Sequence, residues 1–187
     1  RRWNCSLPAS LFGADLSLSV LAAKRILRTK FKNAGIENAL RRSILPGRFQ
    51  KTRIAGRPAI LDVAHNEPAF KALFDTIRKE FHGRRLFVIL GMQSHKRGEE
   101  VILNDLTASD RIYLVKLHHP KSKPIGLWTA FIRAASRGSV RIFPPDAIKR
   151  CLSNAAKESD SKDLIVVTGS FHTVREAVAA QGSAGSP

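Results

Sequence analysis

Short apolar runs alternate with amphipathic helical patterns from residue 59 onward, and this alternation restricts the fold more than any other feature of the sequence. The runs have the length of strands and are apolar on successive residues, as in strands that are buried on both faces. They lie at residues 59–64, 85–92, 111–117, 139–143 and 163–170. A further run, 49–54, is expected to pair with the first across the turn at 55–58. Strands separated by helices form βαβ units, so the sequence predicts an α/β fold with a mostly parallel sheet and flanking helices.

The clearest helical pattern follows the first of these runs. Its apolar residues recur three, four and seven positions apart, which places them on one face of a helix. They are Phe70, Leu73, Phe74, Ile77 and Phe81. Further helices are expected at residues 101–106, 126–136, 145–157 and 171–180. The patterns predict a strand-and-helix domain over residues 46–180, followed by a flexible tail at 181–187.

Two helices are expected in residues 1–45, before the Pro-Gly pair at 46–47 breaks the pattern and marks a domain boundary. The first covers 15–30, with Asp15 as a cap, and the second is a short helix at 35–42. The start of the chain also combines basic residues, an apolar stretch and small residues, as a secretory signal does. A targeting segment is therefore the alternative interpretation of this end.

The chain is strongly basic, with 32 Lys and Arg against 15 Asp and Glu, a formal charge of +17 and a pI of about 10.9. Such a surface attracts polyanions, which include nucleic acids, acidic lipids, nucleotides and polycarboxylates. A nucleic-acid-binding module is thus one candidate function. Only 7% of the residues are aromatic and none interleave with a basic stripe, which argues against it, so we expect no nucleic-acid partner.

The two cysteines, Cys5 and Cys151, are too far apart in sequence to suggest a metal motif or a disulfide framework. A reducing compartment, the cytoplasm, is therefore expected. No apolar run has the length of a membrane span, so no membrane association is expected.

Polar residues that could bind a ligand follow the first buried run, in the stretch "ILDVAHNEPAFKAL" at 60–73. Ligands of open α/β sheets bind at the carboxyl ends of the strands. Asn66 and Pro68 are explained by the start of a helix, as its N-cap and a residue of its first turn. Asp62 could accept hydrogen bonds from ribose hydroxyls, and His65 could hold a carboxylate or lie buried with its ring bonded to the backbone.

Two other stretches carry candidate residues. Gly169 and Ser170 come between the last buried run and the last helix, where Gly allows close approach to the backbone and a helix N-terminus favours an anion. Ser170 could equally be a simple N-cap. Arg48 follows the predicted boundary, where a guanidinium could clamp phosphates between domains or remain solvated.

The order and separation of three motifs resemble a known family. The motifs "LPGRF", "ILDVAHN-P" and "VTGSFHTV" are similar to the C-terminal half of folylpolyglutamate synthase/dihydrofolate synthase, in the Mur ligase superfamily. "GMQSHK" and "HHPKSKP" resemble two loops of that family. The resemblance covers most of the chain and implies a Rossmann-like C-terminal glutamate ligase domain at 46–180, with residues 1–45 as closing helices of the ATP-binding domain.

The resemblance also implies an activity and a role for each candidate residue. In the family, ATP phosphorylates a pteroate or folate carboxylate, and the amine of L-glutamate then attacks the acyl phosphate. Arg48 would contact an ATP phosphate, and Asp62 the ribose. His65 and Ser170 would position glutamate, with Asn66 and Gly169 in support. No metal ligand is expected in this chain, because the family holds its magnesium in the ATP-binding domain, and the full-length enzyme is expected to be a monomer.

The sequence departs from the family in two places. No G-x-x-x-x-G-K-[ST] pattern occurs in the 187 residues, so this chain is expected to be incomplete as a catalyst. Lys96 is followed by Arg97 where the family has an Asp. Another Mur-type amide ligase, with a different amino acid or acceptor, is the alternative within the superfamily.

Overall fold

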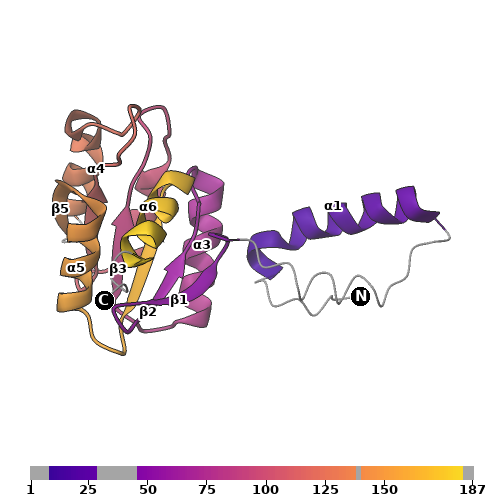
Figure 1. The fold of residues 1–187 in the computed structure, drawn as a ribbon, viewed down its shortest axis with the longest axis horizontal. Coiled ribbons are helices and arrows are strands. Elements are labelled where there is room, and N and C mark those ends of the chain that lie inside the picture. Colours follow the sequence, from indigo (N-terminus) through magenta and orange to yellow (C-terminus); the bar gives the residue numbers. More distant parts are fainter. Residues whose placement is uncertain (1–8, 29–45, 138–139, 183–187) are drawn as a thin grey trace. The chain divides into compact units, whose positions relative to one another are not determined.

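The computed structural model describes residues 9–28, 46–137 and 140–182, and the chain divides into the units Arg1–Pro46 and Gly47–Pro187. In the first unit, helix α1 spans Ala9–Leu27 (Figure 1) and therefore starts earlier than the predicted helix at 15–30. The short helix predicted at 35–42 lies outside the described residues. The assignment of residues 1–45 to an ATP-binding domain stays a prediction.

The second unit is built on a six-stranded sheet within the described residues, with the order β1-β2-β6-β3-β4-β5. The strands are β1 (Gln50–Ile54), β2 (Arg57–Leu61), β3 (Leu86–Leu90), β4 (Arg111–Val115), β5 (Arg141–Asp146) and β6 (Leu164–Thr168). β1 and β2 form the predicted antiparallel hairpin, and all the other neighbouring pairs are parallel. β6 is the last strand in sequence, but it lies between β2 and β3. The predicted α/β class and the mostly parallel, Rossmann-like sheet are confirmed.

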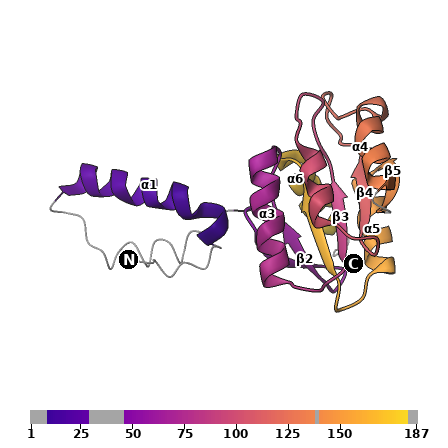
Figure 2. The same cartoon turned by 180° about the vertical axis from the view of Figure 1, so that it is seen from behind.

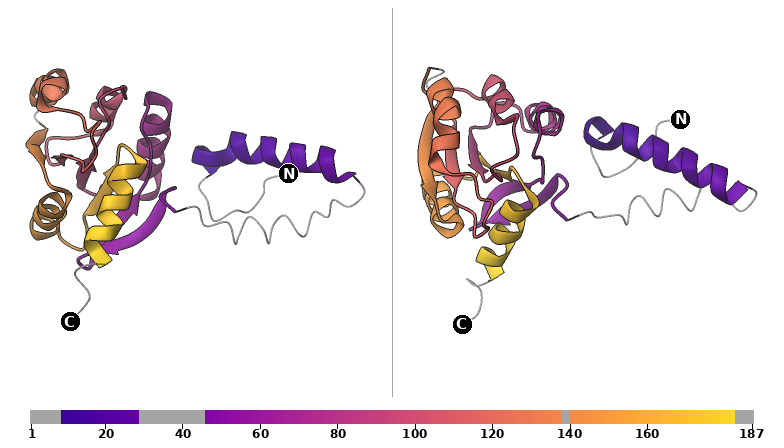
Figure 3. Two further views of the ribbon diagram at one scale, coloured as in Figure 1. Left: turned by 45° about the horizontal axis from the view of Figure 1, so that its top comes forward. Right: turned by 90° about the horizontal axis from the view of Figure 1, so that it is seen from above.

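Helices cover both faces of this sheet. α5 (Ile148–Glu158) packs beside α6 (Phe171–Gly182) on the face that is in front in Figure 1. α3 (Glu67–Glu80), the 3₁₀ helix η2 (Glu99–Asp105) and α4 (Ile125–Arg137) cover the opposite face, which Figure 2 shows from behind. Figure 3 shows α6 and α3 on opposite sides of the sheet. The sheet is therefore the central layer of three.

The core consists of the central strands and the helix residues that face them. Every residue of β3 and β6 is buried, as the continuous apolar runs predicted. The predicted stripe on α3 is also largely confirmed, because Phe70, Leu73, Phe74 and Ile77 are fully buried. On α4, Trp128 and Phe131 pack against each other with ring centroids 5.8 Å apart. Burial of these large side chains is the main source of stability.

In the second unit, three predicted elements differ from the structure. The run at 139–143 was expected to be buried on both faces, but β5 is an edge strand that is half exposed and carries two prolines. Pro is tolerated there because one side of an edge strand has no partner. The expected helix at 101–106 is a 3₁₀ helix, η2. α6 runs to Gly182, two residues into the predicted tail, whose other residues lie outside the described ones.

None of the described helices combines the length and apolar character that a membrane span requires.

Cys151 provides a probe of this core. It lies on α5, is buried, and donates a hydrogen bond through its thiol to the carbonyl of Leu114 at 3.4 Å. Burial raises the pKa of this thiol to about 12, so it stays protonated near neutral pH, whereas alkylation requires the thiolate. In a Cys5→Ser background, iodoacetamide at pH 8 should label Cys151 only through transient unfolding, and therefore slowly. Mass spectrometry with and without denaturant measures this, and rapid labelling of the native chain would contradict it.

Candidate functional site

Asp62 follows β2 directly and joins the start of the second unit to the sheet. The residue is 3% exposed, and its two side-chain oxygens accept hydrogen bonds from the backbone N–H groups of Phe49 and Ala64, both at 2.8 Å. Its own N–H donates to the carbonyl of Val167 on β6, at 2.9 Å. The carboxylate thus fixes the segment that carries Arg48. This structural role was not recognised from the sequence, and the predicted ribose contact stays a prediction.

The charge state of Asp62 reflects two opposing effects. Burial raises the pKa of its carboxyl group, whereas the two backbone hydrogen bonds and the positive charge of Arg48 lower it by smaller amounts. Arg48 itself is exposed. Its guanidinium is therefore accessible for an anion, one residue from the backbone that Asp62 holds.

His65 and Asn66 lie where the chain turns from β2 into α3. Asn66 is the N-cap of this helix, as predicted, with its Oδ1 accepting from the N–H of Ala69 at 3.0 Å. The Nδ1 of the half-buried His65 lies 2.9 Å from the carbonyl of Val63. A carbonyl only accepts, so Nδ1 carries the proton and Nε2 is the ring atom left for a ligand. The sequence allowed a His65 whose ring bonds to the backbone, and the structure confirms this for Nδ1.

Gly169 and Ser170 follow β6, next to the end of β2. The N–H of Gly169 donates to the carbonyl of Ala64 at 2.9 Å, which joins the two strand ends. The φ of Gly169 is +106°, and a Cβ there would lie 2.5 Å from the carbonyl oxygen of Gly91. Glycine is thus required because the backbone that follows β3 packs against it. The sequence had suggested ligand approach instead.

Ser170 takes part in a buried chain of hydroxyl groups. The hydroxyl of Thr173 donates to the carbonyl of Gly91 at 2.5 Å. That uses its proton, so Thr173 accepts the proton of Ser170 across the 2.8 Å between their oxygens. The Oγ of Ser170 also accepts from the N–H of Thr173 at 3.1 Å, which is an N-cap contact. Ser170 therefore has no proton left for a ligand and can only accept a further hydrogen bond.

The loops that follow β3 and β4 are paired with each other at the same edge of the sheet. Gln93 and Ser122 form an isolated antiparallel bridge. The N–H of Ser94 donates to the carbonyl of Lys121 at 2.8 Å, and that of Lys123 donates to the carbonyl of Met92 at 2.9 Å. The stretches "GMQSHK" and "HHPKSKP" therefore form one rim above β3 and β4. Arg97, which stands where the resembling family has Asp, bonds to the carbonyl of Ser94 in its own loop.

A buried ion pair anchors this rim. Lys123 and Glu99 are bonded to each other, and each side chain is 1% exposed. The ammonium also lies 4.6 Å from the ring of Trp128, whose Nε1 donates to the carbonyl of Lys123. Burial, and secondarily Arg97, lowers the pKa of Lys123 to about 8, while the carboxylate of Glu99 favours the charged amine. The second carboxylate oxygen of Glu99 is buried, and no described residue bonds to it.

Histidines line the same edge near the start of α6. His118 follows β4, and its backbone N–H donates to the carboxylate of Glu176 at 2.9 Å. The rings of His119 and His172 lie 4.2 Å apart between centroids. Burial and the neighbouring ring lower the pKa of His172. Within the described residues, no three His, Cys, Asp or Glu side chains are arranged to hold a metal ion.

The structure thus brings together the residues that follow β2 and those that follow β6. The segment of Arg48 is held next to them by the hydrogen bond from the N–H of Phe49 to Asp62. It adds Thr173, Lys123 and Glu99, which sequence reasoning did not select. The GMQSHK and HHPKSKP stretches were noted as loops, but nothing in the sequence pairs Glu99 with a lysine 24 positions later. These contacts depend on which strands are neighbours.

Known proteins are similar to this chain in sequence and in architecture. Residues 47–171 match the family described as Mur ligase, glutamate ligase domain. The dihydrofolate synthase/folylpolyglutamate synthase of Escherichia coli K12 is 27% identical over 169 residues, which are 90% of this chain and 38% of that protein. This chain therefore spans about two fifths of the length of that relative.

Solved structures agree with the sequence comparison. The bifunctional folylpolyglutamate synthase/dihydrofolate synthase of Yersinia pestis, complexed with AMPPNP and Mn ion, superposes with a TM-score of 0.72 and 27% identity, over 94% of this chain and 40% of that one. Another such bifunctional enzyme, with Mn, AMPPNP and L-glutamate bound, gives a TM-score of 0.67 and 28% identity, over 86% of this chain and 37% of that one.

Proposed function

The chain belongs to the glutamate ligase domain family of the Mur ligases, and from this premise we propose that it is the C-terminal part of an ATP-dependent ligase that adds L-glutamate to dihydropteroate or folylpolyglutamate. The observation that carries the proposal is the joined edge of β2 and β6, where backbone hydrogen bonds bring the segment of Asp62 and His65 beside that of Ser170, in a chain related to such enzymes. The reaction is inferred from the relatives, and the role of each residue is inferred from its own hydrogen bonds and exposure.

We assign the glutamate site from the protons available at this edge. The Nδ1 proton of His65 is donated to Val63, so His65 can hold a carboxylate only through a protonated Nε2, as the imidazolium. Ser170 has only a lone pair to offer, which suits the amine of glutamate. A donor on one strand end and an acceptor on the next would orient glutamate with its amine toward the acyl group.

ATP would supply the phosphoryl group that activates the substrate carboxylate as an acyl phosphate. Arg48 is exposed and fits a phosphate contact. Asp62 is less available for a ribose contact, because both of its oxygens already accept hydrogen bonds from backbone N–H groups. One of these bonds, from Phe49, holds the segment that carries Arg48. Magnesium ligands and the P-loop are proposed to come from an N-terminal ATP-binding domain, to which residues 1–45 would contribute helices. Exposed apolar residues on α1, such as Leu18 and Ile26, are consistent with such a larger domain.

The test uses the longest open reading frame that contains this chain. If that frame has no ATP-binding domain, the domain of the E. coli relative is joined to it. Phosphate release that depends on both ATP and L-glutamate is measured with dihydropteroate and with folate acceptors. His65→Ala should lower kcat/KM for glutamate by about 100-fold or more, because positioning and charge stabilisation are lost. Ser170→Ala should lower it by about tenfold.

His82→Ala is the matched control, because His82 is an exposed histidine just beyond the opposite end of α3. It should keep full activity. Wild-type rates in both His65→Ala and Asp62→Ala would refute the site assignment. A preference for a different amino acid in the same assay would instead identify another Mur-type amide ligase.

A further inference from the structure

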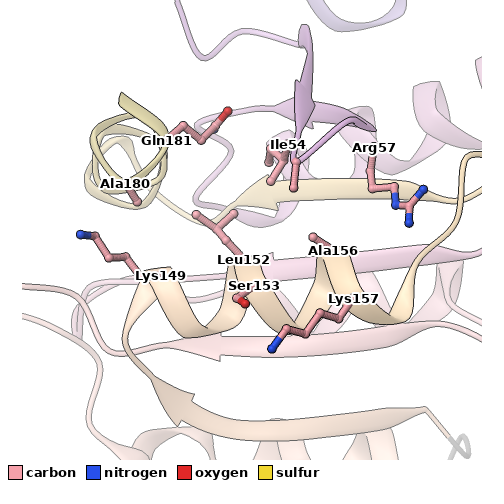
Figure 4. Close-up of a pocket in the computed structure, with 10 residues that line it drawn as sticks. Ile54, Arg57, Lys149, Leu152, Ser153, Ala156, Lys157, Ala180 and Gln181 are labelled. Atoms are coloured by element: carbon pink, nitrogen blue, oxygen red, sulfur yellow. The ribbon is translucent and has the colours of Figure 1, made fainter. Parts of the chain in front are cut away.

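A second concave surface lies on the face of the sheet that α5 and α6 cover. It has a volume of about 780 Å³ and lies between the β1–β2 turn, α5 and the end of α6 (Figure 4). Arg57, which lines it, is the first residue of β2, whereas Asp62 follows the last residue of the same strand. A five-residue strand is about 16 Å long, so the end of the groove that Arg57 lines is separate from the candidate site, and Lys149, in the first turn of α5, lies at the other end of the groove.

The floor of the groove is apolar. Leu152 and Ala156 lie one helical turn apart on α5 and point toward the hairpin, with Ile54 opposite them in Figure 4. Ile54 and Leu152 are themselves buried. An apolar floor of this size matches the pockets that bind small organic molecules.

The rim of the groove is cationic, and none of the residues that line it is acidic. Lys149 and Lys157 lie eight positions apart on α5, which places them about 12 Å apart along its axis and about 80° apart around it. Arg57 contributes a third charge from β2, and its buried Nε has no hydrogen-bond partner among the described residues. Three cations around an apolar floor complement a molecule with negative charges and an apolar body.

We propose that this groove binds an elongated small molecule that carries an anionic group at each end of an apolar body. The apolar body would lie over Leu152 and Ala156, and its ends would pair with the two lysines. Arg57 would donate an additional hydrogen bond. The charges of Arg57, Lys149 and Lys157 would thus bind this ligand, a role that is separate from the candidate active site.

The probe for this proposal is sebacate, a linear aliphatic dicarboxylate, titrated into the full 187-residue chain. Methyl NMR signals of Ile54, Leu152, Ala156 and Ala180 should shift saturably, with a Kd at or below about 1 mM. Decanoate, with one carboxylate, should bind about tenfold more weakly, and decanediol should not bind measurably. Added salt should weaken sebacate binding, because the charges are at the rim.

Two double variants separate specific pairing from general attraction. Lys149→Gln/Lys157→Gln should weaken sebacate binding by at least tenfold. Lys71→Gln/Lys79→Gln removes the same charge at the same spacing from α3, on the opposite face of the sheet, and should change the Kd by less than twofold. The proposal is overturned if sebacate causes no saturable shift at the groove methyls, or if both double variants weaken binding equally.

Discussion

A Lys123→Met variant should unfold with a free energy about 3–5 kcal/mol lower than that of the unmodified chain, because it leaves Glu99 buried without its partner. The loss should be smaller at pH 5 than at pH 7, since a buried, unpaired carboxylate takes up a proton more readily in the folded state than in the unfolded one. Urea unfolding followed by circular dichroism at both pH values measures the difference.

The control for this prediction is the double variant Glu99→Leu/Lys123→Met. It replaces both charges by apolar side chains of similar size, and such replacements are often neutral or stabilising. We therefore expect it to recover most of the stability that the single variant loses. A single variant as stable as the unmodified chain would show that the buried pair does not hold the rim together.

The free energy of unfolding of a Gly169→Ala variant should be lower than that of the unmodified chain by about 3 kcal/mol or more. Two costs add at this position, because φ is +106° and the new Cβ would lie 2.5 Å from the carbonyl oxygen of Gly91. The backbone atoms in contact cannot rotate away as a side chain could. Since Gly169 also joins the ends of β2 and β6, ligase activity of the completed enzyme should fall with stability.

Two other glycines separate these costs. Gly56 has a φ of +79° but open space where a Cβ would lie, so Gly56→Ala should cost only about 1 kcal/mol. Gly126 lies in α4 with neither a positive φ nor a close neighbour, so Gly126→Ala should be neutral or stabilise by about 0.5 kcal/mol. Equal effects at Gly169 and Gly56 in urea unfolding would exclude the contact with Gly91 as a cause.

Much of the fold could be predicted from local patterns. The buried strands β3 and β6 are continuous apolar runs, and the stripe of α3 has the period of a helix. Asn66 was identified as an N-cap because capping depends on residues within one turn. β5 was less well predicted, since an apolar stretch does not reveal whether a strand is central or at an edge.

The candidate site was only partly predictable. Local sequence pointed to Asp62, His65 and Ser170, because each lies between the end of a strand and the start of the next helix. It did not reveal that Asp62 binds the backbone of Phe49, or that Thr173 bonds to Gly91, 82 positions away in the chain. Such contacts form only once distant segments are neighbours.

The sequence by itself determined the α/β class and most of the helix and strand positions, because these depend on the spacing of apolar residues and on caps and turns. It also indicated which strand ends carry polar residues. Only the tertiary structure decided that β6 lies between β2 and β3, and this strand order brings His65 and Ser170 to one edge. The same packing paired Lys123 with Glu99 and formed the cationic groove. The physical reason is that strand order and burial depend on the free energy of the whole packed core, which no local stretch contains.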